Sequence, residues 1–311
     1  SGSLSGEAAL RRICAFSPPA LLASLIWGLA VIFVKWAVVE LSPLAVVILR
    51  FAVASLGCFA LLPAARRAFA GQRPWAPLIV LALVSITIPQ LCYTAGLRLT
   101  SALHGGWIMG WQPALTALVS VPLLRERLTR LRLLGIGMGA VGMTLVLSEG
   151  NFASLTLVRA SLRGDLLVLA AAFFWALHAA LGRQYALRCP PIALTVYSTL
   201  LGSLLLLPFL GISEMSQAWH ALSARFWASV LFLGLLASVA AYWLWYRALE
   251  ACEASLVAAY VYLQPLVTAA AAALFLREAI AAFTWIGGGL ILAGLFVARS
   301  PADAALGERR A

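Results

Sequence analysis

Few side chains that could do chemistry lie within the long apolar segments of this 311-residue chain. Arg50, His104 and His178 are the basic groups well inside these segments, whereas the 11 acidic residues all fall between segments or at their ends. An arginine in such a place can bind a carboxylate or extend outward to Glu40 or the headgroups. A histidine can exchange a proton near neutral pH or act as a neutral hydrogen-bonding partner. Both interpretations stay open for each of the three.

Aromatic and amide side chains are more numerous in the middle of the apolar segments. Small-ligand pockets are typically apolar and aromatic, with a few polar groups that fix orientation. Aromatic side chains also anchor helices at membrane interfaces and pack inside helix bundles, so each residue has a structural alternative. With the two histidines, the predicted substrate-binding residues are Trp27, Gln90, His104, Trp107, Trp111, Trp175, His178, Tyr242, Tyr260 and Gln264.

Two prolines in equivalent surroundings, Pro113 and Pro265, each follow a glutamine inside an apolar segment. A proline within a helix frees a carbonyl and bends the axis. We expect the two positions to be either gating hinges or fixed bends.

Other reactive constellations do not occur in these segments. They contain no acidic pair, no nucleophile beside a base and no cluster of metal ligands, so we predict no catalytic residue, no metal, no cofactor and no enzyme. The five cysteines are scattered and are expected to be free. Gly137, Gly139 and Gly142 match a dinucleotide-binding pattern, but no strand precedes them. Their surroundings favour close helix packing instead.

The elements that position these residues must be membrane-spanning. Hydrophobic residues make up 63% of the chain and charged residues 11%, against about 45–50% and about 25% in soluble domains. Apolar runs of about 20 residues are long enough to cross a bilayer as helices, and they lack the alternation of barrel strands. The ten predicted spans are 18–39, 43–63, 77–97, 101–122, 131–148, 165–186, 191–210, 226–246, 254–275 and 281–298.

The net charge of +11 predicts orientation more directly than it predicts a partner. With ten spans, more than twice as many basic residues fall on the side of the two termini as on the opposite side. Basic loops stay cytoplasmic, so both termini are expected inside. We therefore predict the lipid bilayer and a small-molecule substrate as partners, no nucleic acid, and function as a monomer.

An internal repeat relates the two halves of the chain. Trp27, Lys35 and Pro43 recur at one spacing as Trp175, Arg183 and Pro191. A second set recurs at a slightly longer spacing. Its first-half members are Leu97, Ala102, Gln112, Pro113, Thr116, Leu124, Arg125, Glu126, Gly135 and Gly142. In the same order, their second-half counterparts are Leu249, Ala254, Gln264, Pro265, Thr268, Leu276, Arg277, Glu278, Gly287 and Gly294. Because each copy holds five spans, the copies must be inverted, an arrangement typical of alternating-access carriers. The expected fold is all-α and polytopic, with ten transmembrane helices in two inverted five-helix repeats.

The motifs within the copies resemble a known family. They include Pro43 with Arg50-Phe51, Thr100-Ser101-Ala102, Gln112-Pro113, the run Leu-Leu-Arg-Glu-Arg-Leu at 123–128, and the second-copy Gln264-Pro265 and Leu276-Arg277-Glu278. This pattern is similar to EamA-type transporters of the drug/metabolite transporter superfamily, including its branch of YddG-like aromatic amino-acid exporters. The resemblance implies a central cavity lined by spans 1, 3, 4, 6, 8 and 9, with spans 5 and 10 peripheral. Ser198 stands where the second copy would repeat Arg50, so the halves are not equivalent.

Together these features predict an exporter in the bacterial inner membrane. We expect it to carry small metabolites, foremost aromatic or hydrophobic amino acids, by facilitated diffusion or exchange, because no carboxylate lies inside a span. A multidrug exporter of aromatic cations and, more remotely, an intramembrane enzyme are the alternatives. The predicted parts are a cytoplasmic segment 1–17, a first repeat 18–148, an external linker 149–164, a second repeat 165–298 and a cytoplasmic tail 299–311.

Overall fold

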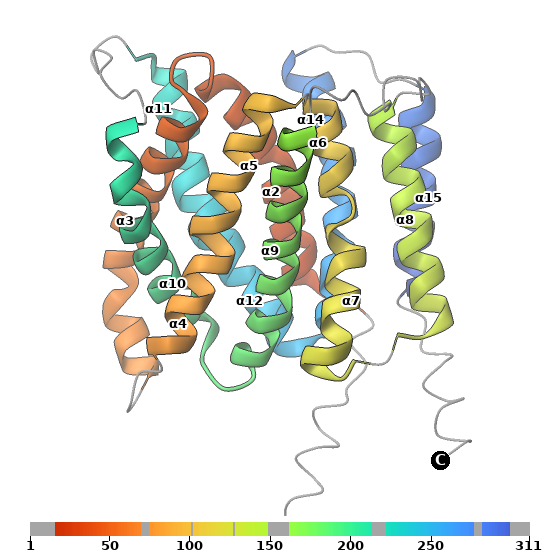
Figure 1. Cartoon of the computed structure of the whole chain (residues 1–311), viewed down its shortest axis with the longest axis horizontal. Helices are drawn as coiled ribbons and strands as arrows, with labels where there is room; N and C mark the ends of the chain where they lie inside the picture. Colours follow the sequence, from red (N-terminus) through yellow and green to blue (C-terminus); the bar gives the residue numbers. More distant parts are fainter. Residues whose placement is uncertain are drawn as a thin grey trace, which may run out of the picture.

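The computed structural model of this chain describes residues 16–69, 75–100, 102–126, 128–148, 162–212, 222–276 and 282–298, and these residues form a bundle of helices without strands (Figure 1). The predicted segment 1–17, linker 149–164 and tail 299–311 lie almost wholly outside the described residues. Those boundaries therefore stay predictions.

The helices of the first half run in the order expected from the apolar segments. They are α2 (Pro18–Ala37), α3 (Pro43–Ala68), α4 (Trp75–Ala82), the π-helix η1 (Leu83–Thr87), α5 (Ile88–Leu99), α6 (Ala102–Met109), α7 (Gln112–Leu124) and α8 (Arg130–Ser148).

The second half of the chain is also built of helices in its described residues. It comprises α9 (Leu162–Ala186), α10 (Pro191–Leu206), the 3₁₀ helix η4 (Leu207–Ile212), α11 (Ala224–Leu231), the π-helix η6 (Phe232–Ala240), α12 (Ala241–Ala251), α13 (Ala254–Ala259), the 3₁₀ helix η7 (Tyr260–Leu263), α14 (Gln264–Leu276) and α15 (Ala282–Ala298).

Helix starts follow local sequence rules. The Ser17 and Ser42 side chains accept hydrogen bonds from Ala20 N at 3.3 Å and Ala45 N at 3.4 Å, and a proline follows each serine at the first helical position. A hydroxyl acceptor satisfies an amide that would otherwise lack a partner, and proline has no amide to leave unpaired.

Eight helical segments of the described residues are long and apolar enough to cross a membrane. The predicted fourth span is divided at Gly110 and Trp111 into α6 and α7, and the predicted tenth span is the 17-residue helix α15. Both α7 and α15 are apolar but shorter than a full crossing. The protein is therefore a polytopic helical membrane protein, while the number of ten crossings stays a prediction.

Packing pairs each half with the other. Helix α2 contacts α12 and α14, α9 contacts α5 and α7, α3 lies against α10, and α8 lies along α15. The α8–α15 contact depends on glycines: a Cβ on Gly135 would lie 2.4 Å from Gly294 O, and one on Gly142 would lie 2.6 Å from Gly287 O. The predicted close packing is thus confirmed at Gly142 and at Gly139, where a Cβ would meet the Tyr262 ring, but not at Gly137, which has open space around it.

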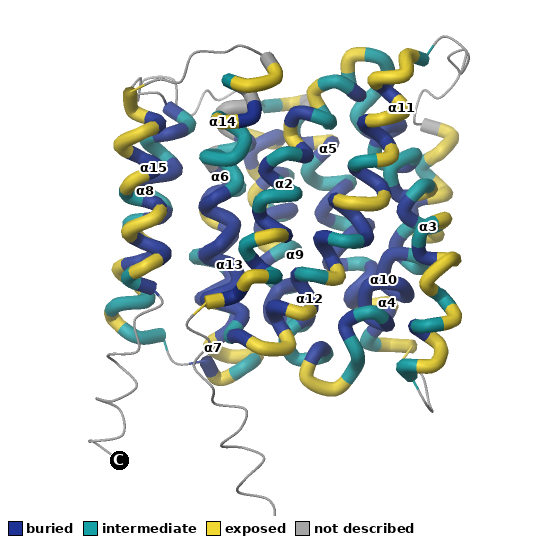
Figure 2. Tube along the Cα trace, turned by 180° about the vertical axis from the view of Figure 1, so that it is seen from behind, coloured by how far each residue is buried: buried dark blue, intermediate teal, exposed yellow. Residues whose placement is uncertain are grey.

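Burial follows the arrangement of a bundle in lipid. The buried stretches face the interior and the exposed ones face outward (Figure 2). Many exposed side chains are large and apolar, among them Leu56, Leu118 and Phe296. Cys58, Cys92 and Cys189 are free as expected, but Cys252 is disulfide-bonded, so the expectation of five free cysteines was wrong.

Candidate functional site

An aromatic cluster lies halfway along the helices, where the two halves meet. The Trp27 ring packs edge-on against Tyr242 with 5.7 Å between centroids, and against Trp245 at 5.1 Å. Trp27 Nε1 donates a hydrogen bond to Ala237 O at 2.8 Å. Trp27 is half-buried, whereas Tyr242 and Trp245 are buried. Helix α2 of the first half is thereby fixed against η6 and α12 of the second.

A second cluster repeats this geometry with the halves exchanged. Trp175 Nε1 on α9 donates to Ser85 O in η1 at 3.0 Å, and its ring lies 5.7 Å from that of Tyr93. The Tyr242 hydroxyl donates to the same Ser85 carbonyl at 3.1 Å, so the two clusters are connected.

The carbonyls that accept these bonds belong to π-helical segments. Ser85 lies in η1 and accepts from Trp175, whereas Ala237 lies in η6 and accepts from Trp27. A π-turn disturbs the regular hydrogen bonding of a helix, and such turns are frequent at functional sites. The structure thus brings Trp27, Trp175 and Tyr242 together, held by a backbone feature that periodicity did not reveal; their role in substrate binding stays a prediction.

His178 lies beside this cluster and has a defined partner. It is 4% exposed, its Nε2 lies 3.1 Å from the Tyr246 hydroxyl, and its ring packs on Tyr242 and Tyr246. A neutral imidazole can make this hydrogen bond in either tautomer. The geometry is that of a hydrogen-bonding core histidine, the structural alternative considered from the sequence.

Arg50 points into the bundle. Its Nε donates to the Ser238 hydroxyl at 2.6 Å, and Ser238 Oγ donates in turn to Leu233 O at 2.9 Å. Glu40, the outward partner considered for Arg50, instead accepts hydrogen bonds from the Ser223 amide and hydroxyl at 2.8 and 2.6 Å. These bonds hold the pKa of the Glu40 carboxyl below its usual value. The outward interpretation of Arg50 therefore does not describe this structure.

The remaining predicted residues are more dispersed. Gln90 is buried and Gln264 half-buried, whereas the buried Tyr260 accepts a hydrogen bond from Ser17 N at 3.0 Å, near the beginning of α2. Pro113 and Pro265 each stand at the second position of a helix, α7 and α14, directly after an irregular stretch. The side chains of His104 and Trp107 lie outside the described set.

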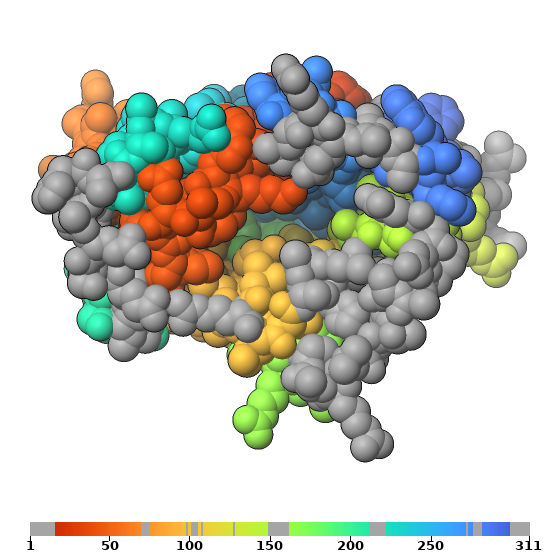
Figure 3. Space-filling view, turned by 90° about the horizontal axis from the view of Figure 1, so that it is seen from above, coloured from red at the N-terminus to blue at the C-terminus, as the bar shows by residue number. Residues whose placement is uncertain are grey.

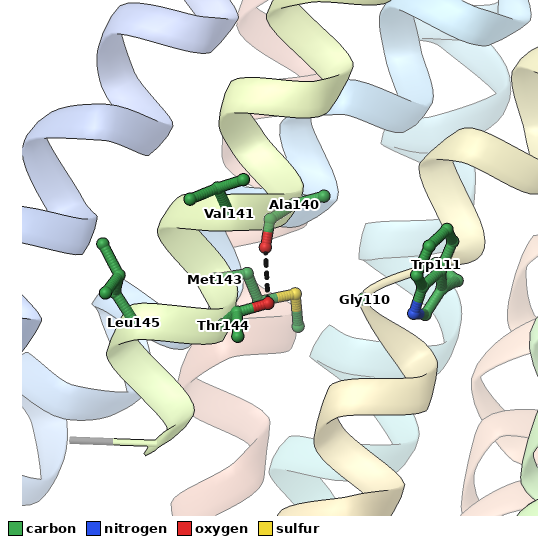
Figure 4. A pocket seen from close by; sticks show the side chains of 7 residues that line it. All are labelled: Gly110, Trp111, Ala140, Val141, Met143, Thr144 and Leu145. Carbon is green, nitrogen blue, oxygen red and sulfur yellow. Dashed lines mark hydrogen bonds between the residues drawn. The ribbon is translucent and has the colours of Figure 1, made fainter. Parts of the chain in front are cut away.

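Trp111 lies apart from the aromatic cluster. It is 49% exposed and lines a shallow cavity of about 300 Å³ between the α6–α7 break and α8 (Figure 4). The other lining residues are Gly110, Ala140, Val141, Met143, Thr144 and Leu145. The Thr144 hydroxyl donates to Ala140 O at 2.9 Å within its own helix. This lining has no charged group that could orient a polar ligand.

One end of the bundle, at the lower edge of Figure 1, carries the corners α3–α4, α7–α8, α9–α10 and α12–α13. We call it the lower end. Here the Glu126 carboxylate accepts hydrogen bonds from Ala254 N at 2.7 Å and from Ser255 Oγ and N at 2.6 and 3.3 Å. These groups begin α13, so a carboxylate of the first half caps a helix of the second.

Basic side chains add to this contact, which we call the Glu126 cap. Arg132 forms an ion pair with Glu253 and donates to Ser255 Oγ at 3.1 Å. Arg183 NH1 donates to the carbonyls of Leu249 and Glu250. Arg125, in the left-handed region at φ 54°, ends α7 and turns the chain toward Glu126. Sequence reasoning treated Glu126 only as an acid outside the spans and part of a repeated motif.

The opposite, upper end has a different shape. The space-filling view of this face is hollowed between α2, α5 and α14, and deeper segments are visible on the floor of the hollow (Figure 3). The bundle is therefore closed by polar contacts at its lower end and indented at its upper end.

Comparison with known proteins gives a consistent result. The model of the EamA-like transporter family matches residues 19–148 and again 162–300. An uncharacterized transporter of Archaeoglobus fulgidus is 32% identical, with 89% of this chain and 94% of the relative covered. A probable amino-acid metabolite efflux pump of Salmonella typhimurium is 30% identical over 89% and 92% of the two chains, and an Escherichia coli protein of the same description is 26% identical.

A solved structure shares the fold, with a TM-score of 0.77, 20% sequence identity, and coverage of 90% of this chain and 94% of the other. The helical bundle, the two matched stretches and the relatives agree with one another. The chain belongs to the EamA-like transporter family.

Proposed function

We propose that this protein exports small metabolites, foremost amino acids with aromatic or hydrophobic side chains, across the bacterial inner membrane. The observation that carries the proposal is the aromatic cluster of Trp27, Trp175 and Tyr242 between the two halves, with one end of the bundle closed and the other hollowed. Rings of this kind bind flat apolar groups. Relatives described as probable amino-acid metabolite efflux pumps support the same substrate class.

Alternating access through two inverted repeats is the proposed mechanism. Its support is the correspondence of contacts: α2 with α12 and α14, α9 with α5 and α7, and an indole–carbonyl bond in each half. In such a carrier the site between the repeats opens to each side in turn. The Glu126 cap would then close the cytoplasmic side in the conformation seen here.

The orientation rests on the basic residues. Arg66, Arg67, Arg125, Arg130, Arg132, Arg183, Arg188 and Arg247 lie at the lower corners of the described chain. Cytoplasmic ends of membrane proteins are enriched in such residues. The lower end is thus the cytoplasmic one, and the hollow faces outward.

Transport is proposed to be facilitated diffusion or exchange. The acidic residues among the described part of the chain are Glu40, Glu126, Asp165, Glu250 and Glu253, which all lie at helix ends or corners. Proton coupling by an intramembrane carboxylate would require one of them deeper in the bundle.

Counterflow in proteoliposomes tests this function. Vesicles holding an unlabelled amino acid should accumulate the labelled one transiently, with phenylalanine, tryptophan and leucine accumulating more than aspartate or lysine. Vesicles without the protein give the background. If no amino acid accumulates above that background, the proposed function is wrong.

A rival function, export of aromatic cations, has one favourable observation. The ring faces of Trp27, Tyr242 and Trp245 could attract a cation. Labelled aromatic quaternary amines in the same counterflow assay separate the two, because a cation exporter would accumulate them in preference to amino acids.

A further inference from the structure

The Arg50 side chain extends toward the middle of the membrane. Arg50 is seven residues after Pro43, at the upper end of α3, which places its backbone about 10 Å along the helix. Its partner Ser238 lies in η6, which continues α11. Counted from Ala224 at the upper end of α11, Ser238 is about 20 Å along this helix and therefore deeper in the membrane than Arg50. A long basic side chain that merely avoids lipid extends toward the nearest headgroups. Arg50 extends in the opposite direction.

The charge of Arg50 has no acidic counterpart among the described residues. Its guanidinium carbon lies 5.2 Å from the centroid of the Phe51 ring, and its Nε is bonded to the uncharged hydroxyl of Ser238. By contrast, Arg132 pairs with Glu253, and Arg183 donates to two backbone carbonyls. An intramembrane cation without an acidic partner is costly and typically marks a ligand or ion pathway.

Ser238 fixes the orientation of the guanidinium. Its hydroxyl hydrogen goes to Leu233 O, and its oxygen accepts from Arg50 Nε. The two terminal nitrogens of Arg50 make none of the hydrogen bonds found among the described residues. A guanidinium presents its nitrogens as a planar fork that matches a carboxylate.

We propose that Arg50, oriented by Ser238, binds the carboxylate of the exported substrate, while Trp27 and Tyr242 contact its flat apolar group. This inference rests on the proposed export function and specifies its substrate class. Trp27 and Tyr242 are in ring contact with one another. Trp27 also donates to Ala237 O, and the next residue in η6 is Ser238, which holds Arg50, so the cluster and the guanidinium meet at the same turn of η6.

The proposal extends beyond amino acids because no acid among the described residues offers a counter-charge for an ammonium at this site. The described acids nearest the upper end, Glu40 and Asp165, are engaged at helix ends: Glu40 with Ser223, and Asp165 with the Thr100 hydroxyl. A substrate is therefore recognised by its carboxylate and its ring. Aromatic monocarboxylates without an amino group should be carried as well as aromatic amino acids.

The arginine of this site has no counterpart at the corresponding position of the second half, which is Ser198. At the position corresponding to Arg50, the Ser198 hydroxyl donates to Leu194 O of its own helix at 2.6 Å. We therefore expect one carboxylate to bind per transport cycle.

Three probes test the proposal on the full-length protein in proteoliposomes and by calorimetric binding in detergent. Phenylalanine has both charged groups, phenylacetate only the carboxylate, and phenethylamine only the ammonium. Wild-type protein should bind and carry phenylalanine and phenylacetate, and phenethylamine at least about tenfold less well. Arg50→Gln should weaken binding of both carboxylates about 10- to 100-fold, as expected for loss of a charge-assisted hydrogen bond. Arg50→Lys should restore part of that affinity.

Arg66→Gln is the matched control, because Arg66 lies exposed at the other end of the same helix. It should bind all three probes as the wild type does. Ser238→Ala should weaken phenylacetate binding less than Arg50→Gln, since it frees the guanidinium without removing it.

The outcomes separate the inference from the function. Transport of phenylalanine that is unchanged in a folded Arg50→Gln variant, or preference for phenethylamine over phenylacetate, would overturn the carboxylate site while leaving an amino-acid exporter. Absence of binding and transport for all three probes in the wild type would overturn both.

Discussion

Replacing Glu126 by glutamine should open the lower end of the bundle. The carboxylate accepts three hydrogen bonds from Ala254 and Ser255, at 2.7, 2.6 and 3.3 Å, and it is 9% exposed. Glutamine is nearly isosteric but keeps one acceptor oxygen, and its amide group would face an N–H or O–H donor. Losing one charge-assisted hydrogen bond costs about 2 kcal/mol. The ratio of open to closed conformations should therefore rise about 30-fold.

Chemical modification of a cysteine at a buried position measures this ratio. Val257 in α13 is fully buried, so Val257→Cys in a background without native cysteines should react slowly with a water-soluble thiol reagent. When opening is fast relative to reaction, the rate is proportional to the open fraction. Glu126→Gln should raise it about 30-fold.

Glu250→Gln is the control for loss of a negative charge at the same end. Glu250 is exposed, and the ion pair that its carboxylate forms among the described residues is with Arg247, at 3.8 Å. The Glu250→Gln substitution should leave the rate of thiol modification within about twofold of the parent protein, because surface ion pairs contribute little to stability. Equal rates for the Glu126→Gln and Glu250→Gln proteins would refute the role of the Glu126 cap.

Three further predictions concern stability. Trp27→Phe removes the indole donor to Ala237 O and should lower the free energy of unfolding by about 1 kcal/mol. Trp175→Phe should lower it less, because Tyr242 still donates to Ser85 O. Thermal melting in detergent compares the two variants, and equal losses of stability would contradict the predicted difference. Gly135→Ala should destabilise the protein by about 1–3 kcal/mol, because the added Cβ would collide with Gly294 O. Gly137 has open space around it, so Gly137→Ala should be neutral or stabilising. Matching melting temperatures for the two variants would argue against the α8–α15 contact. Glu40 has a lowered pKa in the folded state, so its bonds to Ser223 contribute to stability above the usual pKa of a glutamate. This contribution is lost as the pH falls through the lowered pKa. Glu40→Gln should therefore remove that part of the acid-induced loss of melting temperature. Identical pH profiles of melting temperature for the variant and the wild type would show that these bonds do not contribute.

The course of the helices could largely be predicted from the sequence because apolar length is dictated by the bilayer. The starts of α2, α3 and α10 at Pro18, Pro43 and Pro191 were foreseeable from local rules. The break at Gly110 and Trp111 was not, since the apolar run continues through it. The π-helices η1 and η6 were also missed, because a π-turn leaves hydropathy unchanged and depends on the groups that its carbonyls meet.

The positions of some candidate site residues could be anticipated, although their role in binding stays a prediction. Residue type and mid-span position identified Trp27, Trp175 and Tyr242, which the structure places in contact. The same criteria selected Trp111 and Tyr260, which lie apart, because a single sequence does not reveal which face of a helix meets its neighbours. The direction of Arg50 depends on Ser238, far away in the sequence, and could not be read from α3 alone.

Exchange of labelled phenylalanine in proteoliposomes tests the carrier account most directly. With no proton gradient imposed, unlabelled phenylalanine outside should accelerate the efflux of labelled phenylalanine from loaded vesicles, and the acceleration should saturate. This result is predicted because one site is reached from each side in turn. Efflux that external phenylalanine does not change, or that proceeds only when a proton gradient is imposed, would contradict the account.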